Sequence, residues 1–195
     1  MIGVVLCGGQ SLRMGQDKGL IDSKSEAKAW AEIVRDKFYT ISIPSFLSIN
    51  QSQAENYLLH FNEDDLIVDN PSLKVQGPLL GLFSVHLKYP DQDLIVVACD
   101  MINIDSVALM KLVSSYNSSH PDAIAFKGER IEPLCAIYSS QGLAKIYSAH
   151  QEKKLYKNSM MHALEELNAE YISIPEKWNS FFKNFNNAED VNGKS

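Results

Sequence analysis

The chain has few cysteines, no excess of basic residues and no long apolar run, and each lack removes a class of protein. Its three cysteines have no paired spacing of the kind that indicates a disulfide framework or a zinc site. The formal net charge of −6 argues against a nucleic-acid-binding protein, which usually carries a basic face. No apolar run approaches the roughly 20 residues of a membrane helix, and the apolar first residues lack the basic segment of a signal peptide. We therefore expect a cytoplasmic protein that binds neither nucleic acid nor membranes.

What the chain does have is an alternation of apolar runs of strand length with amphipathic stretches of helix length. We predict strands at residues 2–7, 45–49, 66–68, 94–98, 123–126, 133–138 and 171–174. We predict helices at residues 27–38, 53–61, 79–87, 106–116, 142–150 and 159–167. This alternation is typical of an α/β fold with a mostly parallel sheet. No linker divides the chain, so we predict a single domain over residues 1–195.

The same patterns predict how particular residues pack. Ser106 is expected to cap the helix over residues 106–116, with Val107, Met110 and Val113 together on one side. The cysteines, each in or beside an apolar run, are expected to be small buried residues: Cys7, Cys99 and Cys135. In a parallel sheet of this kind, ligands bind beyond the carboxyl ends of the strands, so polar residues at those ends are candidates for a functional site.

A glycine-rich loop, CGGQSLRMGQDK, follows the first predicted strand. Gly8 and Gly9 let the backbone approach a phosphate closely, while Arg13 and Lys18 supply cations for a triphosphate. The loop matches neither the GxxxxGK[ST] nor the GxGxxG pattern of the common phosphate-binding motifs. A glycine turn with solvated basic residues is the alternative interpretation. The gathering of both cations in one loop favours phosphate binding.

A second polar group follows the strand predicted over residues 94–98. Asp100 stands directly after it, where a carboxylate is a hard oxygen ligand suited to Mg²⁺ beside triphosphate oxygens. The alternative is an aspartate that caps the next helix. Both polar groups are expected at the same edge of the sheet, which is why we consider them one site.

Residues 6–18, LCGGQSLRMGQDK, closely resemble the L-A-G-G-x-S-x-R-M-G-x-D-K signature of the MobA-like nucleotidyltransferases, with Cys7 in place of the usual alanine. The resemblance implies a three-layer, Rossmann-like fold of the nucleotide-diphospho-sugar transferase type. It also implies a Mg²⁺-dependent transfer of a nucleotidyl group. In guanylyl members of the family the donor is GTP and the acceptor is molybdopterin, and other molybdenum-cofactor proteins are candidate partners.

The resemblance also implies roles for individual residues. Those that would bind the nucleotide are Leu6, Cys7, Gly8, Gly9, Lys18, Asn50, Asp69 and Asp100. Within this set, Lys18 would bind phosphate, Asn50 would help to hold the base, and Asp100 would also bind the metal. We assign the catalytic roles to Arg13, Lys18 and Asp100. The stretch after Asp100 lacks the proline that is common in the family, a change that affects the loop more than the ligand.

The acceptor side is read from the last part of the chain. Residues 182–190, FKNFNNAED, resemble the closing F-x-N-x-N-T-P-E-D of the family, and we assign Asn184 and Asn186 to acceptor binding. Basic residues often serve the acceptor in relatives. Here Lys153, Lys154 and Lys157 are available, although a solvated helix face is the alternative.

Three functions remain in competition. The first is GMP transfer from GTP to molybdopterin, in which the acceptor phosphate attacks the α-phosphorus without a general base. The second keeps this chemistry but uses CTP or another phosphorylated acceptor. The third is a non-catalytic nucleotide-binding protein on the same fold. Leu6, Asn50 and Asp69 favour the first.

Overall fold

A seven-stranded sheet forms the centre of the computed structural model, which describes residues 1–8, 17–23 and 26–185. The strand order is β5-β4-β1-β6-β8-β7-β9. The strands are β1 (Ile2–Leu6), β4 (Ser45–Ile49), β5 (Leu66–Val68), β6 (Leu94–Ala98), β7 (Ala123–Lys127), β8 (Ile131–Tyr138) and β9 (Glu170–Ser173). Only β8 runs antiparallel to its neighbours in this sheet. The predicted α/β fold with a mostly parallel sheet is therefore confirmed.

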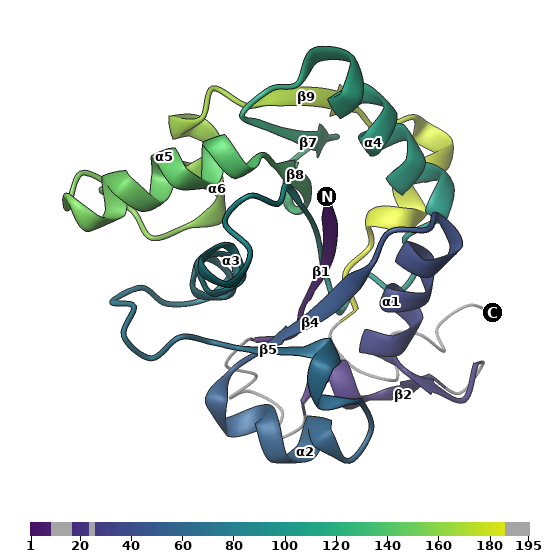
Figure 1. Cartoon of the computed structure of the whole chain (residues 1–195). Helices are drawn as coiled ribbons and strands as arrows, with labels where there is room; N and C mark the ends of the chain where they lie inside the picture. Colours follow the sequence, from purple (N-terminus) through teal and green to yellow (C-terminus); the bar gives the residue numbers. More distant parts are fainter. Residues whose placement is uncertain (9–16, 24–25, 186–195) are drawn as a thin grey trace.

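Helices cover both faces of the sheet, which gives the expected three layers (Figure 1). One face carries α1 (Trp30–Thr40) and α4 (Ser106–Ser119). The other carries α3 (Pro78–Lys88), α5 (Ser140–Gln151) and α6 (Met160–Glu166), while the short α2 (Ala54–Leu58) lies near the end of β5. The described residues also form four 3₁₀ helices: η1 (Lys18–Leu20), η2 (Gln51–Gln53), η3 (Glu63–Asp65) and η4 (Glu176–Phe182).

The two faces of the sheet bury two apolar cores. Successive side chains of a strand point to opposite faces, so β6 sends Ile95 and Val97 to the core under α1 and α4. It sends Leu94 and Val96 to the core under α3, α5 and α6. Every residue of β6 is buried, which explains why its sequence is apolar throughout rather than alternating.

The predicted cap of α4 is wrong. Asp105 caps the helix, because its carboxylate accepts the Val107 N–H at 2.8 Å. Val107 and Met110 are each 49% exposed, so the side of the helix that carries them is not the one that packs on the sheet. The buried side consists of Ala108, Leu109, Leu112 and Tyr116. Both sides of this helix carry an apolar stripe at helical spacing, and the periodicity alone could not decide which one packs on the sheet.

The chain enters α1 through a small hairpin that was not predicted. Its strands are β2 (Asp22–Ser23) and β3 (Lys28–Ala29), paired antiparallel. This hairpin takes residues that we expected in the helix, so α1 begins at Trp30 rather than at residue 27. Trp30 itself is fully buried.

Several smaller expectations can be compared with the structure. All three cysteines are buried and none forms a disulfide, as predicted. The three lysines proposed for acceptor binding are exposed, but they follow α5 instead of lying on it: Lys153, Lys154 and Lys157. No helix among the described residues has the length and apolar character needed to cross a bilayer.

Candidate active site

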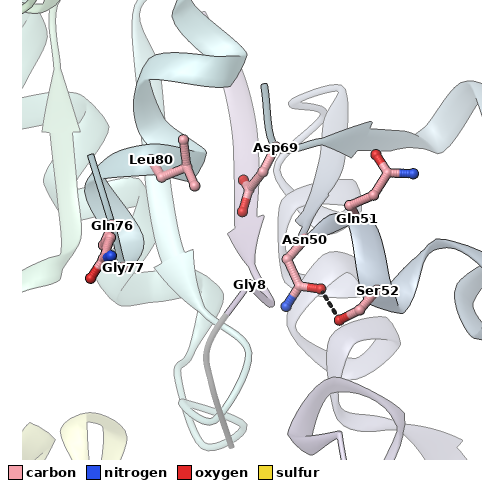
Figure 2. A pocket seen from close by; sticks show the side chains of 8 residues that line it. All are labelled: Gly8, Asn50, Gln51, Ser52, Asp69, Gln76, Gly77 and Leu80. Atoms are coloured by element: carbon pink, nitrogen blue, oxygen red, sulfur yellow. Dashed lines mark hydrogen bonds between the residues drawn. The ribbon is translucent and has the colours of Figure 1, made fainter. Parts of the chain in front are cut away.

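The carboxyl ends of β1, β4 and β5 meet at a cavity of about 500 Å³. The register pairs Leu6 with Ser48 and Ile49 with Val68, so the residues that follow the three strands come together. The cavity is lined by Gly8, Asn50, Gln51, Ser52, Asp69, Gln76, Gly77 and Leu80. Figure 2 shows the Asp69 carboxylate between Leu80 on one side and Asn50 on the other. Three residues predicted from separate parts of the sequence thus line one cavity.

Two glycines are required by the close packing at and near this cavity. A Cβ atom at Gly8 would lie 3.4 Å from Asp69 Oδ2, so any larger side chain there would occupy the space beside the carboxylate. Gly81 is a buried residue of α3. A Cβ there would approach Ser48 Oγ to 2.5 Å, so only glycine lets α3 pack this closely on β4.

Asp69 is a half-buried carboxylate with an unused oxygen. Its backbone N–H donates to Ile49 O at 2.8 Å, which fixes the residue at the end of β5. Oδ1 is buried and has no hydrogen-bond partner among the described residues. Burial raises the pKa of this carboxyl to about 6. A buried acceptor without a partner costs free energy, so the site favours a ligand that donates hydrogen bonds here.

Asn50 is held by its own turn. Its side-chain oxygen accepts the Gln53 N–H at 3.1 Å and the Ser52 hydroxyl at 2.7 Å. These two bonds occupy the amide oxygen, and the amide NH₂ is the group that remains to serve a ligand. Asn50 and Asp69 therefore offer a donor and an acceptor to the same cavity.

Lys18 and Asp100 form the second part of the site. The Lys18 ammonium nitrogen lies 3.0 Å from Asp100 Oδ2, and the two side chains are 23% and 19% exposed. Asp100 follows β6, next to β1, and the Cys99 N–H donates to Leu6 O at 3.1 Å, which extends the pairing of the two strands. The predicted phosphate ligand and the predicted metal ligand are thus in direct contact.

The Asp100 carboxylate suits a magnesium ion that arrives with a nucleotide. No cluster of three metal-binding side chains exists among residues 1–8, 17–23 and 26–185. Mg²⁺ does not need one, because it commonly binds through one or two carboxylates together with substrate phosphates and water. The donor set therefore fits a metal shared with a triphosphate and does not fit a metal held by protein alone.

The comparisons with known proteins identify the family of the chain. A model of the family described as the MobA-like NTP transferase domain matches residues 3–168. The chain belongs to the MobA-like NTP transferase family. This membership places the protein among the nucleotidyltransferases and confirms the predicted resemblance.

Solved structures of MobA-like and related transferases share the fold. Molybdopterin-guanine dinucleotide biosynthesis protein A from Archaeoglobus fulgidus is 22% identical, with 98% of this chain and 95% of that chain covered and a TM-score of 0.76. The 2-C-methyl-D-erythritol 4-phosphate cytidylyltransferase from Francisella tularensis is 11% identical, with 98% and 97% covered and a TM-score of 0.65. The 4-diphosphocytidyl-2C-methyl-D-erythritol synthase from Anaerococcus prevotii is 9% identical, with 97% and 91% covered and a TM-score of 0.67.

Of the remaining predicted site residues of this MobA-like protein, some are buried, one is exposed and others are outside the described residues. Leu6 and Cys7 are buried, and their carbonyls accept from Cys99 N–H and from Gln53 Nε2, so of the segment 6–8 only Gly8 lines the cavity. Asn184 is exposed, and the next N–H, that of Phe185, donates to Asp100 O at 3.1 Å. The others lie outside the described residues and stay predictions: Gly9, Arg13 and Asn186.

Sequence reasoning missed a buried polar network behind the cavity. The Asp17 carboxylate accepts from Gln53 Nε2 at 2.6 Å, from Tyr57 Oη at 3.1 Å and from Gly19 N at 3.0 Å. Asn50 and Gln53 form a capping box at the start of η2. The spacing of these two residues, a cap followed three positions later by glutamine, is the signal that could have revealed Gln53.

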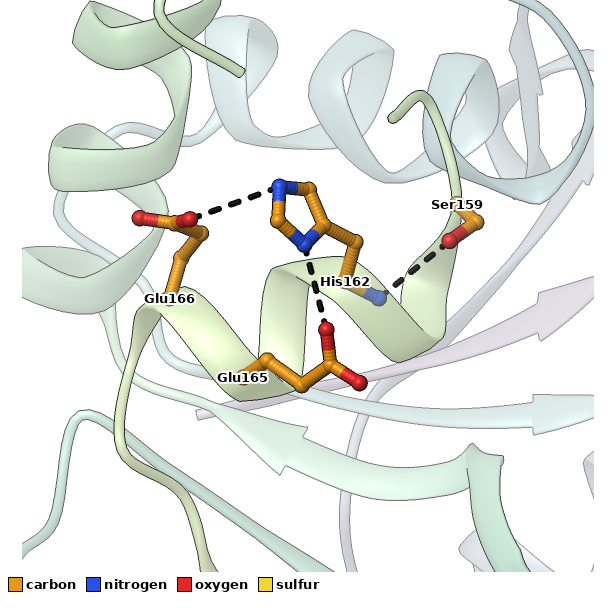
Figure 3. Close-up of polar contacts among 4 residues, drawn as sticks. All are labelled: Ser159, His162, Glu165 and Glu166. Carbon is orange, nitrogen blue, oxygen red and sulfur yellow. Dashed lines mark hydrogen bonds and ion pairs between the residues drawn. The ribbon is translucent and has the colours of Figure 1, made fainter. Parts of the chain in front are cut away.

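A histidine between two glutamates on α6 is not part of this site. His162 Nδ1 lies 3.2 Å from Glu165 Oε2, and Nε2 lies 3.3 Å from Glu166 Oε1 (Figure 3). Residues three and four apart on a helix are neighbours, which accounts for this group without a catalytic role.

Proposed function

We propose that this protein transfers GMP from Mg²⁺-bound GTP to the phosphate of molybdopterin or its molybdenum form, with release of pyrophosphate. The product would be the guanine dinucleotide form of the cofactor. One observation carries the proposal: the Lys18 ammonium and the Asp100 carboxylate are in contact at 3.0 Å, at the sheet edge where Asn50 and Asp69 line a cavity.

The groups in the cavity favour guanine over cytosine. An ionised carboxylate only accepts hydrogen bonds, and guanine offers two neighbouring donors, its ring N–H and its 2-amino group. Asp69 has a buried oxygen ready for such a donor. Cytosine offers a single amino group on the equivalent edge, so one carboxylate oxygen would stay unsatisfied in its complex.

The proposed reaction needs positioning and charge neutralisation more than proton transfer. A phosphate monoester is largely ionised at neutral pH and can attack the α-phosphorus without a general base. In the absence of nucleotide, Lys18 and Asp100 neutralise each other. When the triphosphate binds, the ammonium moves to the phosphates and the carboxylate is available for the metal. Mg²⁺ would supply further neutralisation of the triphosphate charge. Arg13 is proposed to assist on the leaving pyrophosphate.

Two observations support the choice of acceptor. The Archaeoglobus structure with the same fold is a molybdopterin-guanine dinucleotide biosynthesis protein. Asn184 is exposed and is followed by Phe185, which binds the Asp100 backbone, so this predicted acceptor residue lies next to the predicted metal ligand. We propose that Asn184 and Asn186 bind the acceptor, and that proteins of molybdenum-cofactor synthesis or use exchange substrate with this one.

The second candidate is cytidylyl transfer. It is favoured by the fold shared with the cytidylyltransferase from Francisella tularensis and the diphosphocytidyl-methylerythritol synthase from Anaerococcus prevotii. The two candidates share the chemistry at Lys18 and Asp100 and differ in the base.

Calorimetric titration with GTP, CTP, ATP and UTP, each with and without Mg²⁺, tests the proposal. A magnesium-dependent preference for GTP is the expected result, and pyrophosphate release upon addition of molybdopterin would complete the test. A preference for CTP would replace the first candidate by the second. Binding of none of the four would remove the assignment of the site.

A further inference from the structure

Gln53 is a buried polar residue that connects the two parts of the candidate site. We propose that Gln53 is the positioning residue that fixes the base-binding Asn50 and the phosphate-binding Lys18 relative to each other. The inference rests on the proposed function, because the two residues it connects are the proposed ligands of the nucleotide. Gln53 does not line the cavity, and the residue as a whole is only 8% exposed.

On the base side, Gln53 and Asn50 are bound to each other twice. The Asn50 backbone N–H donates to Gln53 Oε1 at 2.8 Å. The Gln53 backbone N–H donates to Asn50 Oδ1 at 3.1 Å. The second bond holds the Asn50 amide in one rotation, so that the same Asn50 group always faces the cavity.

On the phosphate side, the Gln53 amide nitrogen uses both of its hydrogens. One bond goes to Cys7 O at 3.1 Å, at the end of β1. The other goes to Asp17 Oδ2 at 2.6 Å. The other oxygen of Asp17 accepts from Gly19 N at 3.0 Å, so the carboxylate holds the backbone on the far side of Lys18. The position from which Lys18 reaches Asp100 is thus set through Gln53.

The link is packed against a buried aromatic ring. Tyr57 is fully buried and donates its hydroxyl to Asp17 Oδ1 at 3.1 Å. A Cβ atom at Gly19 would overlap that hydroxyl, so the turn η1 sits directly against the ring. Both hydrogens of the Gln53 amide nitrogen are donated and its oxygen accepts one bond, and a buried group that lost its partner could not turn to solvent instead.

The link predicts a pattern of binding losses that no single ligand residue would give. Lys18→Ala should weaken binding of inorganic tripolyphosphate with Mg²⁺ and leave binding of guanosine unchanged. Gln53→Leu should weaken both, each by about tenfold, because it releases Asn50 and the Lys18 turn together. Gln141→Leu is the matched control, since Gln141 is exposed on α5 and away from the cavity.

The experiment is calorimetric titration of the four proteins with guanosine, with Mg²⁺-tripolyphosphate and with Mg²⁺-GTP. Loss of affinity for both partial ligands in Gln53→Leu alone is the expected result. Loss for one of them, or for neither, with normal binding by the wild-type protein would overturn the inference and leave the proposed function standing. A wild-type protein that binds no triphosphate would overturn the proposed function, and with it the role of Gln53.

If Gln53→Leu is poorly folded, exchanging the charges of residues 17 and 53 distinguishes a positioning role of Gln53 from a role in folding. Gln53→Glu sets two carboxylates against each other at residues 17 and 53 and should lose at least about tenfold in affinity for Mg²⁺-GTP. Adding Asp17→Asn restores a donor to that contact at the wild-type net charge, and it should recover part of the loss. A double variant that binds no better than Gln53→Glu would show that the direct contact does not position the site.

Discussion

The two halves of the carboxyl edge are built in different ways. On one side, β1, β4 and β5 are parallel and end in the polar residues of the cavity. On the other side, β8 runs antiparallel and its pairing with β7 is interrupted between Ala125 and Phe126. Aromatic rings pack beneath this irregular part, where the Phe126 ring lies 4.9 Å from that of Phe182 and 6.3 Å from that of Trp178.

The difference indicates what positions the candidate binding residues in each half. In the first half, the strand register and the hydrogen bonds among Gln53, Tyr57 and Asp17 position the candidate site residues without a bound substrate. In the second half, the exposed Asn184 belongs to a segment held by packed rings and by one backbone bond to Asp100. Under the proposed function the first is the nucleotide half, which is positioned by the sheet register, and the second is the acceptor half, which is positioned by packed side chains.

Removal of the Asp100 carboxylate, which lies between the two halves, should have the largest effect on turnover. Asp100→Ala is expected to lower the rate of pyrophosphate release by about 100-fold or more, because the proposed metal ligand is lost. The melting temperature should change little, since the side chain is only partly buried. Asp64→Ala, at an exposed position of η3, is the matched control. Unchanged turnover would remove Asp100 from the reaction.

Adding a methyl group at Gly19 should destabilise the nucleotide half. Gly19→Ala introduces a Cβ that overlaps the Tyr57 hydroxyl, and we expect a loss of about 1–3 kcal/mol in the free energy of unfolding by urea. Tyr57→Phe removes that hydroxyl, so the double variant should lose less than the sum of the single variants. Additive losses would mean that the overlap is not what destabilises Gly19→Ala.

Neutralising Asp69 should separate stability from function in the same half. The pKa of about 6 lies above the usual value, so the folded protein is favoured while Asp69 is protonated and loses this contribution as the pH rises through 6. Asp69→Asn should therefore raise the melting temperature by a few degrees at about pH 8 and by less at about pH 4. Affinity for GTP should fall, because an acceptor of the base is lost. A melting temperature that shifts equally at both pH values would argue against the buried carboxylate as the cause.

The smallest effect is expected on the acceptor side, where it sharpens the contrast between the halves. Asn184→Ala should raise the KM for molybdopterin by about three- to tenfold, the loss expected for one or two hydrogen bonds. Binding of GTP should be unchanged, because Asn184 is exposed and does not line the cavity. A parallel loss of GTP affinity would show that the halves are not independent.

The parts of the fold that follow from local pattern could be predicted, and those that depend on distant contacts could not. The predicted bounds of β4 and β6 agree with the structure, since both are short buried strands between clear breaks. The buried side of α4 was not predictable, because two apolar stripes compete on one helix. In that case the shape of the sheet surface decides.

The site shows the same division. The rule that ligands bind at the carboxyl ends of parallel strands, together with the family motif, leads to Gly8, Asn50 and Asp69. Gln53 and Tyr57 reach Asp17 across 36 and 40 residues of sequence, and nothing local marks that meeting. Such partners become visible only when η1, η2 and α2 are placed in the fold.

The hydrogen bond from Phe185 N–H to Asp100 O also has a consequence for the order of assembly during synthesis. Every strand of the sheet precedes Phe185 in the chain, so the ribosome delivers the sheet before it delivers this bond. A nascent chain with its strands paired still lacks one of the contacts that hold the Asp100 loop. The Asp100 loop therefore gains this contact late in translation, after the sheet that carries the loop.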